Sequence, residues 1–239
     1  MRDDRFSFER ESADFPFYKA NPKLSKLDWI LILVIILIFL FYTQLTPVPC
    51  IRWVVLLLPI IVTLIISRFK ISLIFKKLTK KDIPLIFKLT ILSMISVFLL
   101  CVITSWINFP PDESLNAVSF GLSVEYLLQT VKLAFCLVDE ELFKFFVFIL
   151  SLAVFYKLSN NRKMGVVFAA FVTMILFGAW HFTGYGGSLK IIECIIFRGF
   201  GSICEVYSYV KTKNVLVSYF IHLLYDISLL EASVILQYL

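Results

Sequence analysis

The sequence predicts an all-α membrane protein, a polytopic bundle of seven or eight transmembrane helices. Of its 239 residues, 60% are hydrophobic and only 17% are charged, which exceeds the apolar fraction of ordinary soluble domains. Several apolar stretches approach the roughly 20 residues that a helix needs to cross the hydrocarbon core of a bilayer. Basic residues gather in the short segments between these stretches, which is typical of membrane anchoring.

The apolar stretches divide the chain into a tail and two groups of helices. Residues 1–27 are rich in both charge signs and lack the apolar core of a signal peptide, so we expect a cytoplasmic N-terminal tail. Residues 28–107 hold the first three predicted transmembrane helices, and residues 108–239 hold the others. Proline and glycine residues mark the turns between them. The expected spans are 28–45, 52–67, 84–107, 139–157, 164–183, 188–210 and 214–237.

Residues 121–138 are ambiguous. Their polar side chains share one helical face, so the segment could cross the membrane or lie at its surface. The basic segments of the chain are the tail and the loops 67–81, 157–163 and 211–213. All of them fall on the cytoplasmic side only if 121–138 does not cross. We therefore expect seven spans, with 121–138 interfacial or re-entrant, and an eighth span only if this segment crosses.

The net charge of +6 does not indicate a nucleic-acid partner, because the lysines and arginines lie beside apolar runs and are expected to contact membrane lipid. The five cysteines are scattered, and no CxxC pair is present. We expect them to be small core residues rather than disulfides or zinc ligands.

The stretch VDEELFKF at 138–145 places Glu140 and Glu141 at the start of an apolar span. An ionisable side chain inside a span costs about 2.5–3.5 kcal/mol on insertion scales, so such residues mark candidate functional sites. Lys144 follows one helical turn later and can neutralise one carboxylate within its own helix. The other carboxylate is left without a structural explanation.

Both histidines of the chain, His181 and His222, also fall in apolar spans. Asp226 follows His222 by four residues, so the two side chains share a helix face. Histidine and carboxylate groups can exchange protons near neutral pH, which favours chemistry over a purely structural role. Arg198, Gly201 and Glu205 form a second polar seam, for which we expect a structural ion network.

Three motifs occur in order on separate predicted helices: EELFK at 140–144, FGAWH at 177–181 and HLLYD at 222–226. Together they resemble the CPBP family (CAAX-processing and bacteriocin-processing intramembrane proteases, also called Abi), whose pattern is Glu-Glu, Phe-x-x-x-His and His-x-x-x-Asn/Asp. The resemblance covers roughly residues 120–239. The family's arginine is replaced by Phe145, and the basic residue Lys144 stands one position earlier, as in the Glu-Glu-x-x-Lys motif of PrsW-type membrane proteases.

The resemblance implies an intramembrane endopeptidase that cuts a membrane-associated or peptide-precursor substrate, with 108–239 as its catalytic core. Glu140 would activate a water that His181 also holds, and His222 with Asp226 would stabilise the oxyanion. Glu141 would position these groups, with Lys144 balancing its charge and Phe177 in a supporting role. No cofactor is expected, because no HExxH motif supplies a zinc pair on one helix; the alternative is a zinc ion held by Glu140, His181 and His222.

A non-enzymatic function is the alternative: a membrane immunity, binding or transport protein that uses the same polar cluster. The internal repeat that is typical of transporters is not evident in the sequence. The richness in Phe, Ile and Lys is typical of a low-GC bacterium. We therefore expect a multi-pass protein of a bacterial plasma membrane. Membrane lipid and a peptide or protein substrate are the expected partners, and the oligomeric state stays open.

Overall fold

The computed structural model describes residues 4–11, 14–19, 22–45, 49–106, 124–182 and 190–236. Within these ranges every regular element is helical, which confirms the all-α prediction. By length and composition, three described helices could cross a membrane: α3 (Asp82–Trp106), the Tyr126–Ser159 part of α4 (Val124–Ser159) and α5 (Arg162–His181). The expected number of seven or eight spans stays a prediction.

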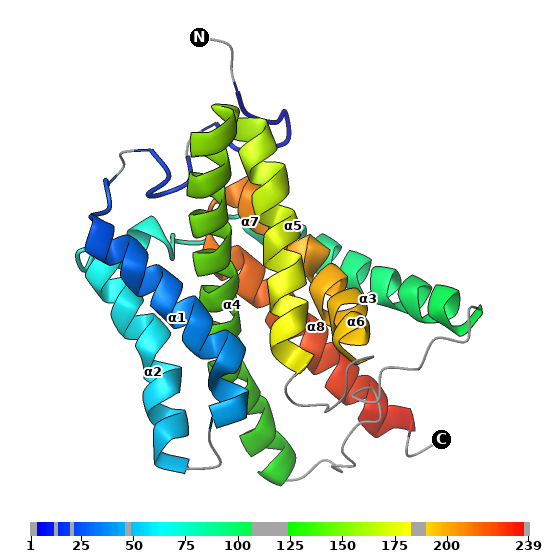
Figure 1. Cartoon of the computed structure of the whole chain (residues 1–239). Coiled ribbons are helices and arrows are strands. Elements are labelled where there is room, and N and C mark those ends of the chain that lie inside the picture. The colour runs from blue at the N-terminus through cyan, green and yellow to red at the C-terminus, as the bar shows by residue number, and fades with distance from the viewer. Residues whose placement is uncertain are drawn as a thin grey trace.

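α4 is the central helix of the bundle. It packs against α5 and α8 and also contacts α1 and α2. Figure 1 shows α1 and α2 on one side of α4, with α5, α6 and α8 on the other and α3 running outward. The remaining elements are α1 (Lys26–Leu45), α2 (Pro49–Ile66), η1 (Ile71–Leu73), α6 (Lys190–Cys194), η4 (Ile195–Gly199), η5 (Phe200–Ser202), α7 (Ile203–Thr212) and α8 (Val215–Leu236).

The continuity of α4 corrects the interpretation of 121–138 as a separate interfacial or re-entrant segment. Its described part, 124–138, is the beginning of the same helix that carries Glu140. No glycine or proline interrupts the 36 residues of α4, so nothing breaks its hydrogen-bond ladder. At about 1.5 Å per residue the helix exceeds the roughly 30 Å hydrocarbon core. Glu140 therefore lies near the middle of a long helix instead of at the start of a span.

The predicted span 188–210 is also not one regular helix. After α6 the chain passes through a π-helical turn (η4) and a 3-10 turn (η5) before α7 begins. A Cβ atom on Gly178 of α5 would lie 2.5 Å from the Cα of Ile195, and one on Gly199 would collide with the carbonyl oxygen of Met174. Only glycine allows two backbones to approach this closely. The irregular turn thus lets the chain pack directly on α5.

The basic segments meet at one end of the bundle, which agrees with the charge pattern. Arg10 of the tail pairs with Asp82 at the start of α3, at 2.6 Å. The side chain of Asn214, between α7 and α8, accepts a hydrogen bond from the backbone N of Lys76 at 2.9 Å. The side of the membrane that this end faces stays a prediction.

The N-terminal tail packs on this end instead of extending freely into solvent. Glu9 accepts hydrogen bonds from Arg162 at 2.7 and 2.5 Å and from Lys213 at 2.5 Å. The ring of Phe15 lies between the same two cations, 5.0 Å from the guanidinium carbon and 5.1 Å from the ammonium nitrogen. Phe15 and Phe17 are each only 2% exposed. The tail is therefore part of the folded structure.

Candidate active site

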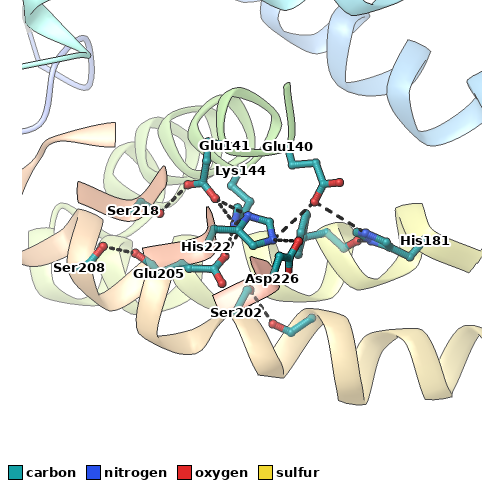
Figure 2. A network of polar contacts seen from close by, with 12 residues as sticks. Glu140, Glu141, Lys144, His181, Ser202, Glu205, Ser208, Ser218, His222 and Asp226 are labelled. Atoms are coloured by element: carbon teal, nitrogen blue, oxygen red, sulfur yellow. Dashed lines mark hydrogen bonds and ion pairs between the residues drawn. The ribbon is translucent and has the colours of Figure 1, made fainter. Parts of the chain in front are cut away.

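The side chains singled out by the three motifs converge where α4, α5 and α8 meet (Figure 2). The carboxylate oxygen Oε2 of Glu140 lies 3.8 Å from Nε2 of His181 and 3.8 Å from Nε2 of His222. Asp226 Oδ2 lies 3.7 Å from the same His222 nitrogen. Residues from three helices, far apart in the sequence, therefore surround one point.

A small cavity of about 70 Å³ lies at this point. It is larger than the roughly 10–15 Å³ that a single water requires. The separations of 3.7–3.8 Å are too long for direct hydrogen bonds but suit groups bridged by water. Besides the motif residues, the lining includes Arg198, Ser202, Glu205 and Tyr225. The cavity therefore has both the room and the polar partners to hold a reactive water.

Each histidine is fixed through its Nδ1 atom. Nδ1 of His181 lies 2.8 Å from the carbonyl oxygen of Phe177, and Nδ1 of His222 lies 2.9 Å from Oε1 of Glu141. A carbonyl and an ionised carboxylate can only accept, so both Nδ1 atoms carry hydrogen and donate. The ammonium of Lys144 also lies 3.3 Å from Nδ1 of His222, but this contact is longer than the one to Glu141, and the ammonium has the carboxylates of Glu141 and Glu205 as partners. Both Nε2 atoms are consequently the ones that face Glu140.

Glu141 is held by a buried polar network that lies behind His222. The ammonium of Lys144 forms ion pairs with both Glu141 and Glu205. The hydroxyl of Ser218 donates to Oε2 of Glu141 at 2.5 Å. Glu141, Lys144 and Glu205 are 2%, 4% and 3% exposed, so each charge depends on these partners for compensation. The network fixes the carboxylate that in turn orients His222.

Phe177 packs between the two histidines, and its supporting role stays a prediction. Its ring centroid is 4.8 Å from that of His181 and 6.1 Å from that of His222, with both pairs edge to face. The ammonium of Lys144 lies 4.5 Å from the centroid of the same ring. The ring thus contacts both imidazoles and the ammonium of Lys144.

Glu205 and Ser218 belong to the site, although the sequence reasoning did not place them there. Glu205 was expected in a structural seam, yet it contacts Lys144 and lies 3.8 Å from Nδ1 of His222. The two partners are 61 positions apart, so no helical spacing could connect them. Ser218 did carry a signal, since it precedes His222 by four residues and therefore shares its helix face.

Two sets of side chains have the donor types that a metal requires. Among the described residues, Glu141, Glu205 and His222 present donor atoms within 4.8 Å of one another. Lys144 lies among them and pairs with both carboxylates, so the chain supplies its own cation there. The set that the sequence suggests for zinc is Glu140, His181 and His222, in which each histidine is anchored through Nδ1 in the way that zinc-bound histidines are. Its donor atoms are more widely spaced than those of the first set, and zinc binding by it stays a prediction.

Residues 126–228 match the model of the Rce1-like family, the type II CAAX prenyl endopeptidases. The matched segment runs from α4 to α8 and includes Glu140, His181, His222 and Asp226. The match confirms the predicted resemblance to the CPBP/CAAX protease family, and it indicates a membrane-associated protease that acts on a peptide or protein. No curated protein and no solved structure matches the chain.

Proposed function

We propose that this chain, which carries an Rce1-like protease segment, is an intramembrane endopeptidase that hydrolyses a peptide bond with a water activated by Glu140. The observation that carries the proposal is the position of Glu140 Oε2, 3.8 Å from an Nε2 atom on each of two other helices. Such an arrangement supplies a base and two oriented imidazoles around one small polar cavity.

Glu140 and His181 would hold the attacking water between them. Because Nδ1 of His181 donates to Phe177, the neutral imidazole leaves Nε2 as an acceptor. A water that donates one hydrogen to Glu140 and one to His181 directs its oxygen lone pairs into the cavity. As this oxygen attacks the substrate carbonyl, Glu140 takes the proton and later passes it to the leaving amine.

His222 would stabilise the oxyanion that forms on the substrate carbonyl. In its doubly protonated form it donates Nε2–H to the developing charge, while Glu141 keeps hold of Nδ1–H. The network behind it combines the carboxylates of Glu141 and Glu205 with the single ammonium of Lys144, so it offers the negative charge that an imidazolium needs. Asp226 borders the same Nε2 atom at 3.7 Å and would help to keep the ring in place.

The zinc alternative uses the same residues. Glu140, His181 and His222 would hold the ion, which would act as a Lewis acid and make its bound water more acidic. The chain's own contribution is unchanged in either case, because Phe177 and Glu141 fix the two imidazoles whether Nε2 faces a water or a metal. We favour the metal-free site, since Glu140 can serve as the base without an ion.

A cleavage assay tests the proposed activity. Purified protein in lipid membranes would be incubated with membrane-associated peptides, prenylated and unmodified, and the products would be identified by mass spectrometry. We expect the wild type to cut at a defined peptide bond and His181→Ala to be inactive. Lys77→Gln, in an exposed loop away from the cavity, is the control and should cut normally. Cleavage by His181→Ala at the wild-type rate would contradict the proposal.

A further inference from the structure

A second cavity, separate from the candidate active site, has a volume of about 360 Å³. The N-terminal tail, the first turn of α1 and the last turns of α4 form its walls. Its polar lining consists of Lys19, Lys23 and Lys157, and its aromatic lining includes Tyr18, Trp29 and Tyr156. None of these side chains takes part in the proposed hydrolysis.

The cavity has an excess of positive charge. Among the residues that the structure describes, three lysines line it and no aspartate or glutamate does. The ammonium of Lys19 lies 5.3 Å and 5.4 Å from the ring centroids of Tyr18 and Tyr156, which are themselves walls of the cavity. Asp14 accepts a hydrogen bond from Tyr18 at 3.1 Å, but it is already paired with Arg162 at 2.9 Å. Lys19 hydrogen-bonds to Tyr18, and among the described residues no carboxylate forms an ion pair with Lys19, Lys23 or Lys157, so the positive charge of this cavity is not neutralised there.

The position of the cavity points to the membrane boundary. It lies at the end of the bundle where the basic segments meet, between the start of α1 and the end of α4. Lysine, tyrosine and tryptophan are the side chains that combine an apolar body with a polar tip, and they favour the headgroup level of a bilayer. Next to the cavity the surface is apolar: Ile30 of α1 is 54% exposed and Val154 of α4 is 46% exposed.

We propose that this cavity binds the phosphate of an anionic membrane lipid. The lysines would contact the phosphate oxygens, the aromatic side chains would border the headgroup, and the acyl chains would lie along the exposed apolar faces of α1 and α4. A soluble phosphate ester shares the headgroup chemistry but gains nothing from those apolar faces. The lipid is therefore the ligand that uses the whole site.

Lipid retention by matched lysine variants tests this binding site. The full chain would be placed in nanodiscs of phosphatidylcholine with phosphatidylglycerol, and the lipid that stays bound would be counted by native mass spectrometry. The test variant is Lys19→Gln/Lys23→Gln/Lys157→Gln. The control is Lys77→Gln/Lys80→Gln/Lys81→Gln, which removes the same charge from an exposed loop at the same end. Both triple variants lose the general attraction of lysine to an anionic surface, so the site is measured by the difference between them. We expect the test variant to bind phosphatidylglycerol at least about 10-fold more weakly than the control, because it also loses direct charge-assisted contacts with the phosphate.

Two outcomes would overturn the proposal. An equal loss in both triple variants would mean that the surface charge of this end attracts lipid without a defined site. Displacement of the bound lipid by soluble glycerol 3-phosphate, as effectively as by phosphatidylglycerol, would mean that a free phosphate ester is the ligand. A further variant, Ala153→Phe, fills the cavity and keeps every charge. It should lose lipid as the test variant does, and normal retention would also contradict the site.

Discussion

At the scale of single residues, the central feature is an ammonium that two carboxylates share. Lys144 pairs with Glu141 on its own helix and with Glu205 on α7. Because Lys144 is shared with Glu205, it does not neutralise Glu141 alone, and Glu141 can hold the Nδ1 hydrogen of His222. We therefore expect Glu205 to act as a positioning residue for His222, through Lys144 and Glu141.

Replacing Glu205 by glutamine tests this role. With one carboxylate gone, Lys144 would neutralise Glu141 and weaken its hold on His222. We expect kcat to fall by about 10-fold or more, which is typical for groups that orient a catalytic histidine, with KM little changed. Glu205→Asp keeps the charge and should recover part of the rate. A variant that loses folding stability but retains the wild-type kcat would show that Glu205 is only structural.

Replacing Lys144 by methionine should have a larger effect on stability. The change leaves Glu141 and Glu205 buried side by side without their cation. Breaking a buried ion pair on one side costs on the order of 3–5 kcal/mol. Lys144→Arg keeps the charge and should be partly tolerated. Thermal unfolding in detergent would compare the three proteins, and equal stability of Lys144→Met and the wild type would contradict the network described here.

At the scale of the elements, the close contact between α5 and η4 determines the shape of one cavity wall. Gly178 and Gly199 let these backbones touch, and the irregular turns that follow place Arg198, Ser202 and Glu205 on the cavity. The π-helical geometry of η4 has a local reason in this contact, and such turns occur frequently at functional sites.

Gly178→Ala is expected to separate α5 from η4, because the added Cβ would lie 2.5 Å from a backbone atom. Overpacking of this kind costs about 1–3 kcal/mol, and activity should fall with stability because the cavity wall moves. Gly201→Ala is the matched control, since its Cβ would meet only a side-chain carbon of Val97 at 3.5 Å. Thermal unfolding and cleavage rate should both change in the first variant. The second variant should unfold near the wild-type temperature, and only its unfolding is compared because Gly201 itself lines the cavity.

The sequence predicted the existence of most helices better than their boundaries. The positions of the apolar stretches were sufficient to locate five helices, because a bilayer requires long apolar segments. These are α1, α2, α3, α5 and α8. They misplaced the start of α4, since Asp139 to Glu141 interrupt the hydropathy but not the helical backbone. They also missed the π-helical turn, because it arises from contact with Gly178 of another helix.

At the scale of the whole molecule, the tail joins helices that are distant in sequence. Burial alone would raise the pKa of the Glu9 carboxyl, but hydrogen bonds from Arg162 and Lys213 outweigh it and lower this pKa to about 2, from an ordinary value of 4.5. A lowered pKa means that the ionised form stabilises the folded state. This contribution is complete above pH 4.5 and is lost as the pH falls towards 2.

Acid should therefore release the tail. The protection factors of the amides in residues 4–11, which relate the observed exchange rate to the intrinsic rate at each pH, are expected to stay high from neutral pH down to pH 4.5 and to fall as the pH drops further towards 2. In Glu9→Gln the tail should exchange rapidly even at neutral pH, because Arg162 and Lys213 lose their shared carboxylate. Glu11→Gln, an exposed neighbour, is the control and should behave like the wild type. Identical profiles for Glu9→Gln and the wild type would contradict this role.

The candidate site was predictable from the sequence to the extent that its residues follow helical spacing. This spacing pairs His222 with Asp226 and Phe177 with His181. Glu140 and Glu141 could be identified because charged residues are rare in apolar spans. The contacts between helices could not be derived, because no local pattern says which helix faces which. For this reason Glu205 and the lysine-lined cavity became visible only in three dimensions.

The most direct test of the account compares Glu140→Gln with the wild type on one cleaved peptide, with and without a chelator. Glutamine keeps the size of the side chain but removes its affinity for a proton, so we expect at least about a 100-fold loss of cleavage at equal membrane levels. The wild type is expected to keep its activity in the chelator. Chelator-sensitive activity that zinc restores would retain the residues but contradict the metal-free site. Full activity of Glu140→Gln would contradict the central claim that Glu140 activates the water.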